Sequence, residues 1–172
     1  EIMAQPQIVI AKVEGVATAA GCELVAACDL ALASSVARFA VPGVNIGFWC
    51  HTPQVALSRT IGRKQAMMML ATGKLFSADH ALYIGLINEV HAPDALDAAT
   101  DALARHIAQK ASSVLRRGKA SFNRQATLPL GDAYAHAREQ ALANIVAPDA
   151  REGIAAFLEK RDPHWQCAAG ES

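Results

Sequence analysis

The chain has 172 residues, of which 52% are hydrophobic and 19% are charged, and its 16 basic residues equal its 16 acidic residues. This length and hydrophobicity are enough to bury a core in one or two compact domains. A net charge of zero gives no long-range attraction to a phosphate backbone or an anionic lipid surface, which argues against nucleic acid or a membrane as the main partner. No apolar run approaches the length of a membrane span.

The four cysteines show neither a CxxC spacing nor a histidine at metal-ligand spacing; they are Cys22, Cys28, Cys50 and Cys167. The pattern therefore predicts no disulfide framework and no metal site. Reduced thiols, together with a start that lacks the signal-peptide pattern, favour a cytoplasmic protein. Because the sequence begins without methionine, a mitochondrial location is the alternative if a targeting segment precedes it.

The first strand and helix are indicated by a change of pattern near Gly15. The β-branched apolar run at 7–13 predicts a buried strand of a sheet that is covered on both faces. A helix is expected to begin at residue 19 or 20 and to end near residue 28. Two more short strands should follow, at 30–34 and 37–41.

From Thr52 onward the pattern becomes helical. Thr52 before Pro53 is typical of a helix start, and Gly62 and Gly73 are expected at two helix ends. Ser77 is a predicted N-cap residue. The expected elements are helices at 52–62, 63–73 and 77–85 and a last short strand at 86–90.

The sequence after Pro93 is helical almost throughout, with breaks expected near Ser112-Ser113, Pro129 and Pro148-Asp149. An α/β part at residues 1–92 therefore precedes an all-helical part at residues 93–172.

The segment GVATAAGCEL, residues 15–24, places one carboxylate among small side chains. The first N–H groups of a helix lack partners within the helix and attract negative charge. The N–H of Ala20 could therefore stabilise the oxyanion that develops as an enolate forms, and Glu23 could act there as an acid or base. Small residues would let a ligand approach the backbone closely, namely Ala17, Ala19, Ala20 and Gly21. The alternative is a tight strand-turn-helix in which Glu23 only favours the helix N-terminus.

Three separated segments resemble the enoyl-CoA hydratase/isomerase (crotonase) family, and together they span essentially the whole chain; they lie at 6–47, 57–90 and 151–165. The resemblance implies an α/β fold of the crotonase type, a spiral of strand-strand-helix turns. Residues 1–92 would be the C-terminal part of the spiral core, and residues 93–172 a helical region that forms a homotrimer or a dimer of trimers.

The same resemblance implies an acyl-CoA thioester as ligand, with coenzyme A as part of the substrate and no other cofactor. One oxyanion N–H would come from Ala20, and Glu23 would be the acid/base. Substrate contacts are expected from the motif at Pro42 and Gly43. His51 is also expected near the acyl chain, because it belongs to a segment that replaces a glycine-rich stretch of the family. Phe157 and Lys160 match a C-terminal helix that can approach the CoA of its own or a neighbouring subunit.

The sequence also departs from the family pattern. Hydratases of this family have a second glutamate at the position of Gly43, and a glycine-rich stretch is replaced here by FWCHTPQ at 48–54. Family members also carry a substantial portion before residue 6, so this chain is expected to be the C-terminal part of such a protein. Glutamate introduced at Gly43 could supply the missing carboxylate, and hydration is then expected only where the upstream portion completes the oxyanion hole, because Ala20 supplies a single N–H donor. The alternative function is a crotonase-fold binding or scaffolding protein that has lost turnover.

Overall fold

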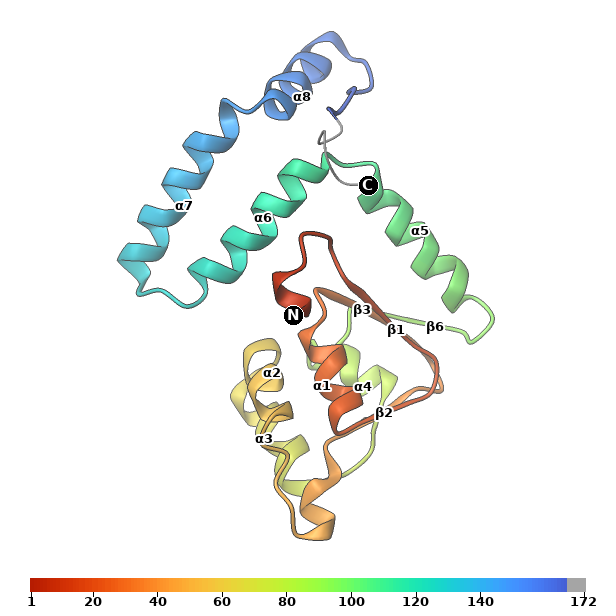
Figure 1. The fold of residues 1–172 in the computed structure, drawn as a ribbon. Helices are drawn as coiled ribbons and strands as arrows, with labels where there is room; N and C mark the ends of the chain where they lie inside the picture. Colours follow the sequence, from red (N-terminus) through yellow and green to blue (C-terminus); the bar gives the residue numbers. More distant parts are fainter. Residues whose placement is uncertain (167–172) are drawn as a thin grey trace. The chain divides into compact units, whose positions relative to one another are not determined.

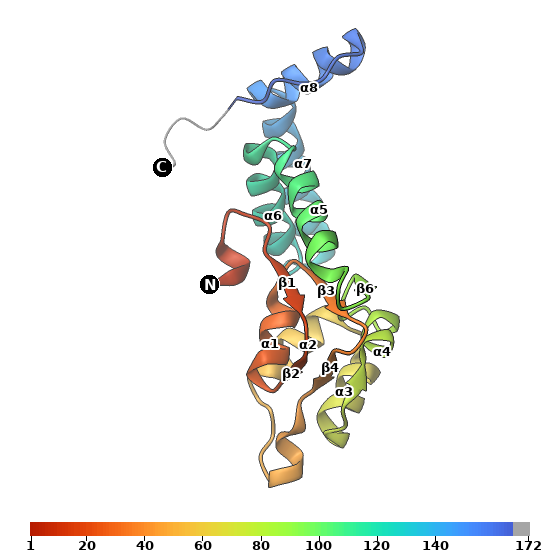
Figure 2. The ribbon, with the colours of Figure 1, turned by 90° about the vertical axis from the view of Figure 1, so that its right-hand side faces the viewer.

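The structure is a computed structural model that describes residues 1–166, so Cys167 lies outside the described residues (Figures 1 and 2). The chain divides into two compact units. One contains Val9–Ala104 with Ile2, and the other contains Glu1, Met3–Ile8 and the chain from Arg105 onward. The division falls inside helix α5 (Leu96–Ala108). The functional boundary expected between residues 92 and 93 stays a prediction.

The Val9–Ala104 unit is built on two small sheets. One is parallel and has the order β1-β3-β6, and the other has the order β2-β4-β5, with β2 parallel and β5 antiparallel to β4. The strands are β1 (Ile10–Val13), β2 (Val16–Thr18), β3 (Leu30–Ser34), β4 (Arg38–Ala40), β5 (Phe76–Ser77) and β6 (Glu89–His91).

Successive stretches of this unit repeat the order strand, strand, helix. The first stretch is β1, β2 and α1, and the second is β3, β4 and α2 after the short helix η2. Because β1 pairs with β3 and β2 pairs with β4, the second stretch stacks on the first as the next turn of a spiral. This arrangement confirms the predicted α/β class and its strand-strand-helix turns. The helical elements are α1 (Ala20–Ala27), η2 (Pro42–Ile46), α2 (Pro53–Thr60), α3 (Arg63–Thr72) and α4 (Ala78–Tyr83).

The core of this unit lies between the strands and the helices that follow them. Phe39, Leu32, Leu57 and Met69 are fully buried there. The strand expected to be covered on both faces is β1, and this expectation is wrong. Lys12 on β1 is exposed and pairs with Asp97 and Glu14, so the face of β1 that carries Lys12 meets solvent. The buried strand is β3, the central one.

The predicted helix ends are confirmed where they depend on local chemistry. Gly73 ends α3 with φ +56°, a left-handed conformation that glycine adopts without strain, and Ser77 Oγ accepts a hydrogen bond of 3.2 Å from the His80 N–H at the start of α4. The helix α2 ends at Thr60 with Ile61 as its C-cap residue, so Gly62 directly follows that cap and also precedes α3. The strands β2 and β5 were not predicted, and β6 begins three residues later than expected.

The second unit is helical, and its breaks confirm the prediction. Its helices are the last part of α5, α6 (Ser112–Gln125), α7 (Leu130–Ile145) and α8 (Pro148–Glu159), and the short helix η1 (Ile2–Ala4) lies near the N-terminus. Asp149 is buried in the first turn of α8 and accepts hydrogen bonds from Ser113 Oγ and from the Gln166 N–H. Trp165 donates its indole N–H to the Gln109 carbonyl at 2.7 Å.

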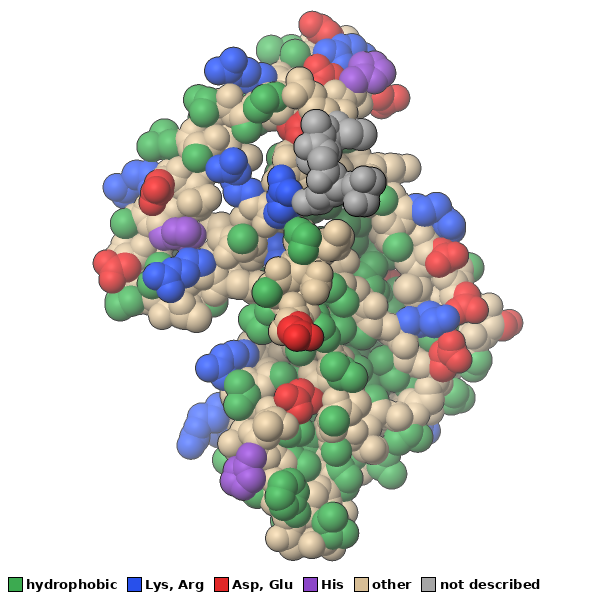
Figure 3. Space-filling view, in the orientation of Figure 1, with side chains coloured by type: hydrophobic (Ala, Val, Ile, Leu, Met, Phe, Trp, Pro, Cys, Tyr) green, Lys and Arg blue, Asp and Glu red, His purple; other side chains and the backbone are tan. Residues whose placement is uncertain are grey.

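Apolar side chains remain exposed on the last two helices. On α7 and α8 they are Leu130, Tyr134, Leu142, Ile145, Ile154, Phe157 and Leu158, and Phe157 is 83% exposed. Apolar side chains are also widespread on the face of the Val9–Ala104 unit that is in view in Figure 3. A compact unit normally buries side chains of this size, so the exposed helix faces are available for association.

Candidate functional site

The candidate site begins where β2 leads into α1. Ala19, between the two elements, has φ +48° and ψ −114°, a conformation that is strained for a residue with a side chain. Its own N–H donates to the Ala40 carbonyl at 3.0 Å, and its carbonyl accepts from the Glu23 N–H at 3.0 Å. The N–H of the next residue, Ala20, donates to no group among the described residues. Backbone strain therefore accompanies an unpartnered donor at the helix N-terminus.

A cavity of about 480 Å³ opens beside this helix start. Its wall consists mostly of apolar side chains and backbone from three places: the β2–α1 turn, η2 with the segment after it, and the start of α2. The lining residues are Ala19, Ala20, Pro42, Gly43, Asn45, Ile46, Phe48, Cys50, His51, Thr52 and Pro53. The cavity could therefore hold an apolar group with one polar atom directed at the Ala20 N–H.

Glu23 is connected to this cavity through Thr52. Glu23 is half-buried one turn inside α1, and Thr52 lies on the cavity wall directly before α2. The Thr52 hydroxyl donates to Glu23 Oε2 at 2.8 Å. The carboxylate is thus held at one oxygen by a residue from the next helix, close to the predicted oxyanion donor.

The surroundings of Gly43 leave no room for a side chain. A Cβ atom added there would lie 2.4 Å from the Phe48 carbonyl oxygen and 2.9 Å from Cys50 Sγ. The Phe48 N–H also donates to the Gly43 carbonyl at 3.0 Å, so the two segments are tied together. The expectation that glutamate could be accommodated at Gly43 is therefore contradicted by the packing of the replacement segment at 48–54.

The other reactive side chains near the cavity have structural surroundings. His51 is exposed and meets Phe48 edge-on, with ring centroids 6.1 Å apart. Cys50 is buried and belongs to the core, as does Cys22. Burial, with a smaller contribution from Cys50, raises the pKa of the Cys22 thiol to about 12. Cys22 is therefore a protonated thiol at neutral pH and a poor nucleophile.

The structure brings together some of the predicted site residues and not others. Those that line the cavity are Ala19, Ala20, Pro42, Gly43 and His51. Ala17 is buried in β2 instead, and Gly21 is not among the lining residues. Phe157 and Lys160 belong to the second unit, on α8 and directly after it, and both are exposed, so their expected role stays a prediction.

Sequence reasoning missed the contributions of Asn45, Ile46, Thr52 and Pro53 to the cavity. The sequence Thr52-Pro53 predicted the start of a helix and did not indicate that the two residues line a cavity. Asn45 fixes the loop, because its side-chain amide donates to the Gly73 carbonyl at 3.2 Å. No sequence pattern around Asn45 predicts its hydrogen bond to Gly73.

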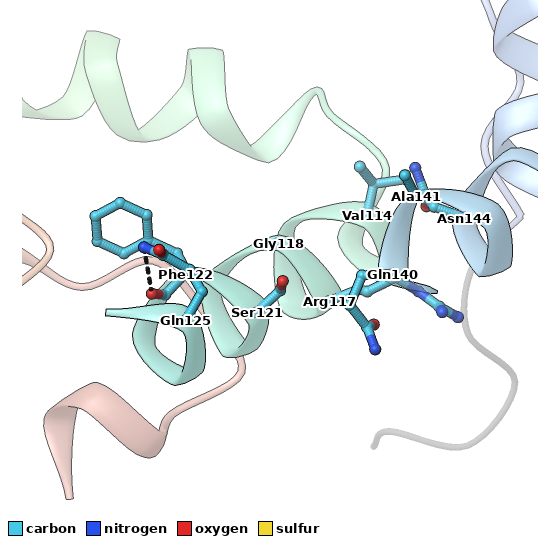
Figure 4. Close-up of a pocket in the computed structure, with 9 residues that line it drawn as sticks. All are labelled: Val114, Arg117, Gly118, Ser121, Phe122, Gln125, Gln140, Ala141 and Asn144. Carbon is cyan, nitrogen blue, oxygen red and sulfur yellow. Dashed lines mark hydrogen bonds between the residues drawn. The ribbon is translucent and has the colours of Figure 1, made fainter. Parts of the chain in front are cut away.

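A second hollow, of about 350 Å³, lies within the helical unit between α6 and α7 (Figure 4). Arg117 and Phe122 of α6 and Gln140 and Asn144 of α7 are among its lining residues. Lys119, also on α6, is buried and donates to the Gln7 carbonyl at 2.9 Å.

In residues 1–166 no helix is long and apolar enough to cross a membrane, and no group of acidic, histidine and cysteine side chains is arranged to hold a metal ion.

Comparison with known proteins gives consistent matches. Residues 1–168 match the family described as enoyl-CoA hydratase/isomerase. The chain is 49% identical over 160 residues to enoyl-CoA hydratase domain-containing protein 3, mitochondrial, of Danio rerio, and 47% identical over 160 residues to the Homo sapiens protein of that name. These alignments cover 93% of this chain but only 55% and 53% of the two relatives. The chain therefore spans about half the length of the curated relatives it matches.

The chain also resembles solved structures of enoyl-CoA hydratase and enoyl-CoA hydratase domain-containing proteins. The chain superposes on an enoyl-CoA hydratase of Mycobacterium smegmatis with a TM-score of 0.93 and 51% identity, covering 95% of this chain and 64% of that one. For human enoyl-coenzyme A hydratase domain-containing protein 3 the TM-score is 0.92 at 47% identity, covering 95% of this chain and 65% of that one.

Proposed function

The chain belongs to the enoyl-CoA hydratase/isomerase family, and we propose that it binds an acyl-CoA thioester in the cavity beside α1 and moves a proton at the α carbon of the acyl group. The observation that carries this proposal is the Ala20 N–H, an unpartnered donor on the wall of an apolar cavity. A thioester oxygen held there would gain stabilisation as negative charge develops on it.

Glu23 is the proposed acid/base. In the forward step its carboxylate takes a proton from the α carbon, the electron pair of that C–H bond becomes the enolate, and the negative charge moves to the thioester oxygen at the Ala20 N–H. Returning the proton to the same carbon gives exchange. In a β,γ-unsaturated acyl chain the enolate extends over the double bond, so returning the proton to the γ carbon moves the double bond to the α,β position and gives isomerisation. Hydration would also need a second group to activate water, and the position of Gly43 supplies none.

Assembly and location extend the proposal. The exposed apolar faces of α7 and α8 support a homotrimer or a dimer of trimers, because association would remove that surface from water. The vertebrate relatives are named as mitochondrial proteins, which favours the mitochondrial alternative over the cytoplasmic one.

One observation favours a second function. Since Gly43 has no space for a carboxylate, the cavity could retain acyl-CoA without turnover, as a binding or scaffolding protein would. The two functions differ in whether a bound ligand loses its α proton.

Proton exchange in D2O distinguishes the two functions. We expect butanoyl-CoA to bind the chain in calorimetry, and its α-proton NMR signal to decay in the presence of the chain. Glu23→Gln should retain binding and lose exchange, because an amide keeps the shape but accepts no proton. Glu14→Gln is the matched control, since Glu14 is an exposed carboxylate of the same unit paired with Lys12. Binding without exchange would establish the binding function, and absence of binding would overturn both.

A further inference from the structure

Thr52 occupies the N-cap position of α2 but does not cap it. A threonine in this position normally accepts a hydrogen bond from an N–H of the first helical turn, and the Thr52 side chain accepts none. Backbone carbonyls accept from the nearby N–H groups instead, since Gln54 N–H donates to Cys50 and Val55 N–H donates to the Thr52 carbonyl. The hydroxyl therefore makes its hydrogen bond outside α2, and it donates to Glu23 Oε2 at 2.8 Å.

The geometry points to Thr52 as a positioning residue for Glu23, an inference that rests on the proposed function. The hydroxyl holds Oε2, whereas Oε1 accepts no hydrogen bond from the part of the chain that the structure describes. A carboxylate fixed at one oxygen presents the other in a defined direction. Thr52 also lines the cavity, whereas Glu23 does not, so the Thr52 hydroxyl links the carboxylate to the cavity wall. Fixed orientation of the reacting group lowers the barrier to proton transfer.

A purely structural tie between α1 and α2 is the rival explanation, and the molecule provides a comparison for it. Thr60, at the other end of α2, has its hydroxyl 2.8 Å from the Ala26 carbonyl of α1 and 3.0 Å from the Ala56 carbonyl of its own helix. Thr60 thus links the same two helices without touching a carboxylate. If Thr52 only joined the helices, removing either hydroxyl would have the same kind of effect.

The experiment measures α-proton exchange of butanoyl-CoA in D2O for the wild-type chain and for Thr52→Val, Thr52→Ser and Thr60→Val. We expect Thr52→Val to lower kcat for exchange about tenfold with KM unchanged, because a charge-assisted hydrogen bond is lost from the reacting group only. Thr52→Ser should restore the rate, since serine keeps the hydroxyl. Thr60→Val should lower the denaturation midpoint and leave kcat unchanged.

A second readout follows the contact itself. The 13C NMR shift of the Glu23 carboxyl carbon, at fixed neutral pH, should move in Thr52→Val and keep its wild-type value in Thr52→Ser and Thr60→Val. Equal exchange rates in wild-type and Thr52→Val, or a parallel loss in Thr60→Val, would overturn the positioning role alone. A wild-type chain that exchanges no α proton would overturn the proposed function and this inference with it.

Discussion

Replacing Gly43 with alanine should destabilise the Val9–Ala104 unit through a single added carbon atom. The new Cβ would stand 2.4 Å from the Phe48 carbonyl oxygen and 2.9 Å from Cys50 Sγ, both closer than packed atoms approach. The Phe48 oxygen belongs to the backbone and cannot move aside as a side-chain end could. Its segment is also held by the bond from the Phe48 N–H to the Gly43 carbonyl. Overpacking of this kind lowers the free energy of unfolding by about 1 to 3 kcal/mol.

Gly21→Ala provides the matched control. Gly21 lies in the first turn of α1 in the same unit, and a Cβ added there would meet nothing within 4 Å. Alanine favours helix over glycine, so this change should leave the free energy of unfolding unchanged or raise it by up to about 1 kcal/mol. Urea titration followed by circular dichroism measures both variants against the wild type.

Equal unfolding free energies for Gly43→Ala and the wild type would refute the reasoning. That result would mean that residues 48–50 can withdraw without loss, and that a glutamate could then fit at the same position. If the loss is found, Gly43→Glu should be more destabilised still and should show no hydration of crotonoyl-CoA in an ultraviolet assay.

Three further predictions concern other parts of the chain. Ala19→Gly should raise the free energy of unfolding by up to about 1 kcal/mol, because glycine adopts φ +48° without strain, and a loss in urea titration would contradict it. The Arg161 guanidinium, with the His164 N–H, lowers the pKa of Glu152 to about 2. The contribution of ionised Glu152 to the free energy of unfolding is therefore complete above pH 4.5 and is lost as the pH falls toward 2. Acid titration of Glu152→Gln should therefore show a shallower loss of stability between these values than the wild type, and identical curves would refute this. Light scattering should give an oligomer for the wild type and a smaller particle for Phe157→Asp, whereas a stable wild-type monomer at micromolar concentration would contradict the assembly.

The sequence predicts those features of the fold that depend on neighbouring residues. Gly73 ends a helix because its own backbone adopts the left-handed conformation, and Ser77 caps one because the N–H it serves lies three residues away. The strand β2 has only three residues, too few for an alternating pattern to be read, and its partner β4 begins 22 residues after β2 does. Short strands of this kind are defined by their neighbours in space.

In the candidate site, too, the sequence predicts only the features that depend on neighbouring residues. The turn before Glu23 is local, and its small residues and carboxylate were sufficient to indicate the Ala20 N–H as a donor. The partner of Glu23 was not foreseeable, since Thr52 lies 29 residues away and its own surroundings indicate a helix cap. The crowding at Gly43 likewise depends on how the segment at 48–50 folds back against Gly43. The spacing of residues in the sequence does not predict that contact.

The chain's two tryptophans are divided between its two units. Trp49 donates its indole N–H to Gln54 next to the cavity, and Trp165 donates its own to the Gln109 carbonyl in the helical unit. Each indole therefore has a fixed hydrogen bond that unfolding of its own unit would break, which changes its fluorescence. Trp165→Phe leaves an intrinsic optical reporter of the cavity unit, and Trp49→Phe leaves one of the helical unit. The order in which the units unfold, and ligand binding near Trp49, can thus be followed without any attached dye.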